Sequence, residues 1–169
     1  MIDTKAKYSA QDIAKWFLYK NYAEQKQKVA ANDDYEVYEG ITHLKLQKLL
    51  YNAQGVYLAS TGKKLFTDDL IAWPHGPVVK DVDDNYCVFG RNPIIIPATP
   101  ENDEIIQKIE SDLEVKNILD MVYDEFSIYT AWQLREMSHV PDAPWSKTAR
   151  YDIISPETIK AYFTNEVLE

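Results

Sequence analysis

Apolar residues recur every three or four positions between residues 42 and 61, and this is the clearest periodic segment of the chain. The residues of this stripe are Leu46, Leu49, Leu50, Ala53, Val56 and Tyr57. Gly62 is suited to end the helix, because glycine readily takes the left-handed conformation of a C-terminal cap. Ala53 and Gly55 are small enough for another element to approach closely. We therefore predict a long central helix over about 42–61.

A second helical pattern lies near the N-terminus. Ser9 places a capping hydroxyl before it, and the pattern extends to about Ala31 with a polar second half. The apolar side chains on one of its faces are Ile13, Trp16 and Phe17. The polar stretch 32–40 that follows is typical of a surface loop.

Two short extended segments are predicted in the middle of the chain. Residues 71–73 are apolar and stop at Pro74, and residues 93–97 form an apolar run between two prolines. Residues 71–73 could pair with residues 94–96 as one short β-ribbon. Between them, valines at positions 78, 79 and 82 indicate a short helix that ends near Gly90.

The chain becomes acidic and helical after Pro100. Residues 111–114 fit a capping box, which predicts a helix break near Ser111. The apolar face expected beyond this break is formed by Val115, Ile118, Leu119, Val122 and Phe126.

Two further helices are predicted in the C-terminal part. Residues 130–133 form another capping box, and Ser155 is an N-cap followed by proline at the first helical position. The core residues expected from these helices are Leu134, Met137, Ile159 and either Tyr162 or Phe163. The fold prediction is thus mainly α: a single compact helical domain spanning residues 1–169.

Composition narrows the class of partner. The chain has 169 residues, 46% of them apolar and 27% charged, which is ordinary for a globular protein. Its net charge of −9 disfavours nucleic-acid binding, which relies on Lys and Arg to displace counterions. A basic or amphipathic partner protein suits this charge better.

Cysteine content and hydropathy indicate the compartment. A lone Cys87 cannot form an intrachain disulfide, which favours a reducing cytoplasm. The N-terminal residues lack the apolar core of a secretion signal, and no apolar run approaches the ~20 residues that span a bilayer. We expect a cytoplasmic protein that does not enter the membrane.

The search for catalytic or metal-binding chemistry finds little. His43, His75 and His139 lie far apart and match no zinc-ligand spacing. The pattern of residues 81–92 begins like a calcium loop but lacks the required glycine and final glutamate. Cys87 has no nearby base in sequence and an apolar setting, so we interpret it as a buried packing residue. The sequence predicts no metal, no cofactor and no enzyme activity.

Aromatic and basic residues remain as candidates for binding. Trp73 and Trp145 lie in proline-braced loops and could be either interface anchors or core residues. Trp16 and Trp132 are interpreted as core residues. The lysines at positions 45, 48, 63 and 64 make this region locally basic, either as a solvated helix face or as a docking strip for an acidic partner.

Several sequence blocks carry a family resemblance. The segments are residues 8–14, the LKLQKLLY block at 44–51, the AWPHGPV block at 72–78, residues 134–139, and Pro144-Trp145. In this order and at this separation they resemble the Panacea-domain family, which includes SocA-like antitoxins and phage-associated GepA-like proteins. The resemblance extends from about Tyr8 to Phe163.

The resemblance implies a function that composition and spacing do not. It implies a mainly helical antitoxin of prophage or plasmid type, which neutralises a cognate toxin encoded by an adjacent gene through direct protein–protein contact. In the SocA-like branch it implies instead an adaptor that delivers the toxin to the ClpXP protease. We place the expected contact surface around Lys45, Lys48, Trp73, His75 and Trp145.

Two competing hypotheses stay open at this point. One is an enzyme whose site converges on His75 and His139. The other is autorepression by DNA binding, which is disfavoured by the acidic charge and by the lack of a clear helix-turn-helix.

Overall fold

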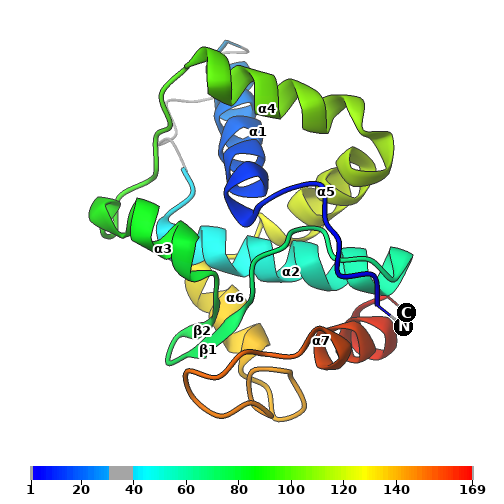
Figure 1. Ribbon diagram of the computed structural model, residues 1–169. Helices are drawn as coiled ribbons and strands as arrows, with labels where there is room; N and C mark the ends of the chain where they lie inside the picture. Colours follow the sequence, from blue (N-terminus) through cyan, green and yellow to red (C-terminus); the bar gives the residue numbers. More distant parts are fainter. Residues whose placement is uncertain (1, 31–39, 169) are drawn as a thin grey trace.

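The predicted central helix is the organising element of the fold. The computed structural model describes residues 2–30 and 40–168, and α2 (His43–Thr61) runs through its middle (Figure 1). The Thr42 hydroxyl accepts a hydrogen bond from the Lys45 amide at its start, and Gly62 ends it in the left-handed conformation with φ 74°. Every residue from Leu46 to Leu58 is buried. The prediction of a mainly α fold around this helix is confirmed.

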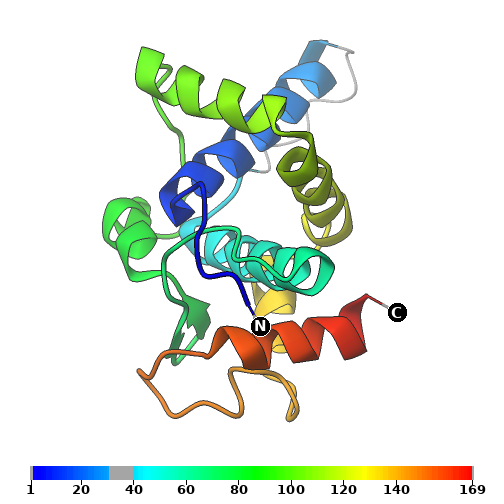
Figure 2. The same cartoon turned by 45° about the vertical axis from the view of Figure 1, so that its right-hand side comes forward.

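The other helices surround α2 on several sides, as Figures 1 and 2 show. The helices α1 and α4 pack against each other on one side, and α7 lies along the opposite side. The helices α5 and α6 also pack against α2, and a short α3 continues into the single turn η1. Their bounds are α1 (Ala10–Ala30), α3 (Lys80–Tyr86), η1 (Cys87–Phe89), α4 (Pro100–Ser111), α5 (Leu113–Phe126), α6 (Ala131–Ser138), α7 (Pro156–Tyr162) and η2 (Phe163–Val167).

The predicted helix starts are largely confirmed. The Ser9 hydroxyl accepts from the Asp12 amide, Thr130 and Gln133 form a reciprocal capping box, and Ser155 caps α7. The break near Ser111 is also confirmed, although the predicted cap is wrong by one residue. Ser111 remains helical and Asp112 is the extended residue that caps α5. The loop predicted at 32–40 falls, apart from Gly40, outside the described residues.

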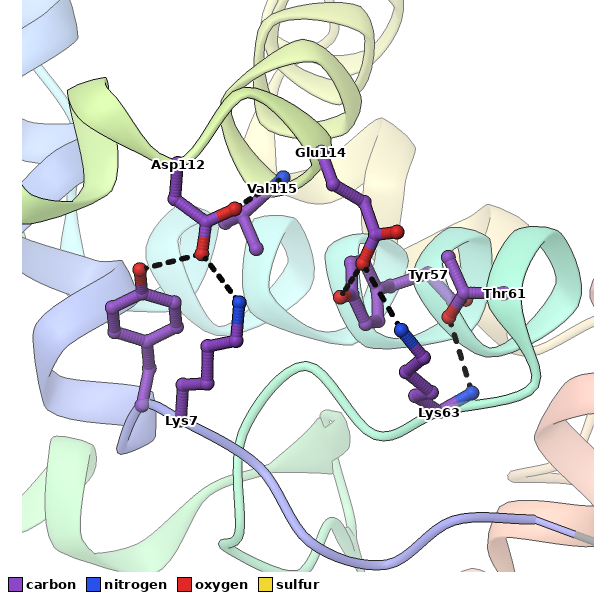
Figure 3. Close-up of polar contacts among 8 residues, drawn as sticks. Lys7, Tyr57, Thr61, Lys63, Asp112, Glu114 and Val115 are labelled. Atoms are coloured by element: carbon purple, nitrogen blue, oxygen red, sulfur yellow. Dashed lines mark hydrogen bonds and ion pairs between the residues drawn. The ribbon is translucent and has the colours of Figure 1, made fainter.

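The start of α5 is anchored by a polar network that joins three parts of the chain (Figure 3). The Asp112 carboxylate accepts hydrogen bonds from the Tyr8 hydroxyl at 2.8 Å and the Lys7 amine at 3.2 Å. Burial would raise the pKa of Asp112, but these hydrogen bonds outweigh it and lower the pKa. Glu114 accepts from the Tyr57 hydroxyl at 2.6 Å, which also lowers its pKa. The network ties α5 to α2 and to the N-terminal segment.

The predicted β-ribbon has the wrong partner. The strand β1 (Ile71–Trp73) pairs antiparallel with β2 (Gly76–Val78), not with residues 94–96. A turn of two residues, Pro74 and His75, lets the chain fold back at once, so little loop entropy is lost. The Ile94 amide donates instead to the Ile41 carbonyl, at 2.8 Å.

Several core predictions are confirmed and three are wrong. The buried members of the predicted set include Trp16, Leu134, Ile159 and Phe163. Trp132 is 60% exposed and Met137 is also exposed, because the short α6 buries only Leu134 and Ser138. Cys87, predicted to be buried, is exposed in the peripheral turn η1. Among the helices of the described residues, none combines the length and hydrophobicity that crossing a bilayer requires.

Candidate protein-binding surface

Two glutamines of α2 fix the path of the chain toward the β1–β2 hairpin. The Gln47 side chain accepts from the Val79 amide at 2.8 Å and donates to the Val79 carbonyl at 3.0 Å. About two turns further along the helix, Gln54 accepts from the Leu65 amide at 2.7 Å and donates to the Phe66 carbonyl at 3.0 Å. All four contacts are buried, where an unpaired backbone group would be costly. The hairpin is therefore held at both of its approaches by the central helix.

Lys48 lies directly beneath the hairpin. Its side chain has no exposed area, and its amine donates to the Pro77 carbonyl at 3.3 Å. A Cβ atom on Gly76 would lie 2.9 Å from the Lys48 amine and 3.0 Å from the Ser138 hydroxyl, and Gly76 also has a φ of 115°. Only glycine fits this position without strain. Gly76 is therefore required for the shape of the hairpin over Lys48.

Burial makes Lys48 an unusual lysine. Loss of solvation, with a smaller effect from the positive charge of Arg135, lowers the pKa of Lys48 to about 7. Among the described residues, no carboxylate forms an ion pair with the Lys48 amine, which donates instead to the Pro77 carbonyl. At neutral pH the amine is therefore partly uncharged and acts mainly as a donor to the hairpin.

Trp145 locks the hairpin to the segment after α6. Its indole donates to the Trp73 carbonyl at 2.6 Å. The His139 ring lies against it at a centroid separation of 3.7 Å, and the Arg150 guanidinium stacks on it at 3.6 Å. His139 itself reaches the Pro74 carbonyl, at 3.3 Å from Nε2. Segments more than 70 residues apart in sequence are thereby joined around one indole ring.

Residues 151–154 form a further edge beside β1. The Tyr151 amide donates to the Ala72 carbonyl at 2.7 Å, and the Ala72 amide donates to the Asp152 carbonyl at 3.0 Å. Tyr151 has a φ of 70°, which is rare for a bulky residue and costs energy. Its side chain is nevertheless 65% exposed, and that of Ile153 is 55% exposed. A strained residue is thus held beside β1 with its aromatic ring exposed to solvent.

We call the resulting patch the hairpin surface. It consists of Trp73, His75, His139, Trp145, Arg150, Tyr151 and Ile153. It contains three of the five predicted contact residues: Trp73 and Trp145 are half-buried, and His75 is exposed at the turn.

The two predicted contact lysines lie elsewhere. Lys48 is buried beneath the hairpin, and the Lys45 amine donates to the Ser127 carbonyl, at 2.6 Å, at the end of α5. The interpretation of a solvated or docking lysine face is therefore wrong for Lys48, and also for Lys64, which is buried too. The reason is that α2 is enclosed on its polar side as well as on its apolar side.

Some residues at or near the hairpin surface were not predicted, because their sequence patterns are weak or absent. Tyr151, Ile153 and Arg150 belong to no periodic or capping pattern. Arg135, which stacks on Trp132 at 4.6 Å, follows it by three positions on a helix, and this spacing could have indicated the pair.

Two polar side chains at the C-terminal end of α6, Ser138 and His139, are bonded within the protein. The buried Ser138 hydroxyl donates to the Arg135 carbonyl at 2.8 Å. His139 Nδ1 lies 2.7 Å from the same carbonyl, and this histidine is the C-cap of α6. His139 and His75 do approach the same turn, through the contact of His139 with Pro74. No group of three metal-ligating side chains is found within residues 2–30 and 40–168.

Comparison with known proteins gives the relationship of the chain. The family model of the SocA-like antitoxin, Panacea domain, matches residues 46–146. Antitoxin SocA of Caulobacter vibrioides is 31% identical over 113 residues, which are 64% of this chain and 60% of that protein. The chain therefore spans about 60% of the length of this relative. No solved structure matches the chain significantly.

The matched region contains most of α2, the hairpin, α6 and Trp145. It therefore includes four residues of the hairpin surface, whereas Arg150, Tyr151 and Ile153 lie beyond it. The resemblance seen in the sequence blocks is confirmed. Because the family model covers more than half of the chain, the protein belongs to the SocA-like antitoxin family with a Panacea domain.

Proposed function

We propose that this protein is an antitoxin that neutralises a cognate toxin by binding it directly through the hairpin surface. Family membership supports the antitoxin role. We place the toxin contact on this surface because of one observation. The strained Tyr151 is exposed there, beside Trp73 and Trp145, which are joined by a hydrogen bond. The single-cysteine composition favours the cytoplasm as the place of this interaction.

A binding role suits the chemistry of the hairpin surface better than a catalytic one. The Ser138 hydroxyl lies 3.0 Å from His139 Nδ1, but it donates to the Arg135 carbonyl and is buried, so a substrate could not reach it as a nucleophile. The Trp145 ring is fixed by its hydrogen bond to the Trp73 carbonyl and by stacking with His139 and Arg150 before any partner arrives. Fixed aromatic side chains lose little conformational entropy on binding, which is typical of interface hot spots.

The first test is co-expression with the protein encoded by the adjacent gene, with growth rescue and complex formation as measurements. Tyr151→Asn removes the ring while keeping a residue that tolerates positive φ, and Trp73→Ala removes the neighbouring indole. Each variant should weaken toxin binding by about 2 kcal/mol or more if these rings are hot spots. The matched control is Tyr22→Ala, an exposed aromatic on α1, which should leave binding unchanged.

Circular dichroism and thermal melting must show that the variants are folded. Unchanged toxin affinity in both folded variants would reject the hairpin surface as the contact. Toxin half-life in the same cells separates the two mechanisms that the resemblance implies. Sequestration predicts a stable toxin in the complex, whereas delivery to ClpXP predicts a toxin that disappears only when this protein and the protease are both present.

A further inference from the structure

An apolar groove lies on the other side of α6 from the hairpin surface. It has a volume of about 580 Å³ and is formed by α5, the C-terminal end of α6 and η2. The apolar residues that line it include Met121, Val122, Phe126, Met137, Val140 and Leu168. On α6, Arg135 and Ser138 face the lysine and hairpin side, whereas Met137 faces this groove.

Several side chains that line the groove are open to solvent. Met121, Met137, Val140 and Leu168 are each between 40% and 46% exposed. Small-molecule sites bury most of their ligand's surface, which a groove with such exposed walls does not do. An elongated partner that covers the apolar side chains fits better. The two methionines favour such a partner, since their flexible side chains adapt to an irregular apolar stripe.

The borders of the groove are acidic. Glu125 and Glu166 line it, and both side chains are exposed. A second depression shares Tyr162 and Glu166 with the groove and adds Asp142 and Glu157. Among the described residues, the one basic side chain that lines either depression is Lys147. A second copy of this chain, with a net charge of −9, would bring like charges together here.

We propose that this groove binds an amphipathic helix of a partner protein, with an apolar stripe flanked by Lys and Arg residues. The apolar stripe covers the methionine-lined floor, and the basic flanks pair with Glu125 and Glu166. This docking site is separate from the hairpin surface. Its test does not involve the toxin, so its failure would leave the proposed antitoxin function untouched.

Methionine NMR provides a direct test, because the chain has three methionines and two of them line the groove. The probe is a synthetic helical peptide of about 18 residues, five helical turns, with a leucine stripe and lysine flanks. Titration into the full chain labelled with ¹³C-methyl methionine should shift the Met121 and Met137 signals, assigned through Met121→Leu and Met137→Leu. The same peptide with glutamate flanks should not shift them.

Charge reversal tests the acidic border. Glu125→Lys with Glu166→Lys should weaken binding of the lysine-flanked peptide by about tenfold or more at physiological salt, where distant charges are screened. The matched control is Glu101→Lys with Glu104→Lys, which makes the same change in net charge at exposed positions of α4.

Three outcomes would overturn the proposal. The first is equal weakening by both double variants, which would indicate only long-range attraction. The second is equal binding of the glutamate-flanked peptide. The third is concentration-dependent self-association of the chain that Met137→Glu abolishes, which would make a second copy the occupant.

Discussion

The buried amine of Lys48 makes the stability of this protein depend on pH in an unusual direction. Its pKa is lowered to about 7 in the folded protein, from an ordinary value of 10.5. Between these values the unfolded chain binds more protons than the folded one. The free energy of unfolding therefore rises with pH in this window. The cost of burying the charged amine is complete below pH 7 and vanishes above pH 10.5.

The size of the effect follows from the same two values. Each pH unit inside the window is worth about 1.4 kcal/mol for one titrating group. Because Lys48 is half titrated at pH 7, stability should increase by about 2 kcal/mol between pH 7 and pH 9. For a chain of this length that corresponds to a rise in melting temperature of about 4–8 °C.

The perturbation that isolates this effect is Lys48→Met, which keeps an unbranched side chain, shorter by one atom, and removes its charge. The variant loses the hydrogen bond to the Pro77 carbonyl, worth about 1 kcal/mol, but avoids a larger desolvation cost. We expect it to be more stable than the parent protein at pH 7. This advantage should shrink by about 2 kcal/mol at pH 9.

Urea denaturation at several values between pH 6 and pH 9 measures this difference. Lys147→Met, at an exposed position, serves as the control and should give a curve parallel to that of the parent protein. If the Lys48→Met and parent curves are also parallel over this range, the Lys48 amine does not titrate there and the reasoning from its burial is wrong.

Three further substitutions test other parts of the fold. Gly55→Ala should destabilise the protein by about 2 kcal/mol, because the added Cβ would lie 2.3 Å from the Phe163 ring; wild-type stability would show that the ring moves freely. Tyr51→Phe should be neutral or stabilising by about 1 kcal/mol, since the buried Tyr51 hydroxyl has no hydrogen-bond partner within residues 2–30 and 40–168; a clear loss in thermal melting would contradict this. Asp112→Asn should cost about 1 kcal/mol at pH 7 by weakening the contact with Tyr8. Because the pKa of Asp112 is lowered on folding, this difference should decrease as the pH falls and the carboxylate is protonated; a difference that does not decrease with pH would contradict it.

Most of the helical skeleton could be predicted from the sequence because its signals act over a few residues. The caps at Thr130 and Ser155 join groups three positions apart, and Gly62 ends α2 through its own backbone conformation. The close approach expected at Gly55 is also present, with Phe163 as the neighbour. Such local interactions are the same whatever packs around them.

The candidate surface could be predicted only in part. Trp73, His75 and Trp145 were identified by their aromatic and proline-braced setting, but the hydrogen bond that joins two of them spans 72 positions. Tyr151 gave no signal because its exposure depends on a strained backbone held by β1. The partner predicted for β1 was wrong for a related reason. Apolar extended segments look alike as pairing partners in sequence, and the two-residue turn at Pro74 and His75 places β2 beside β1.

The sequence by itself therefore determined where the helices start and stop and which family the chain resembles. Only the tertiary structure decided that Lys48 is buried, because a periodic stripe marks one buried face and gives no sign that a helix is enclosed on every side. The same enclosure placed Gly76 against the lysine and brought Trp145 to the hairpin. These contacts between distant segments, which no spacing along the chain encodes, form the surface on which the proposed function depends.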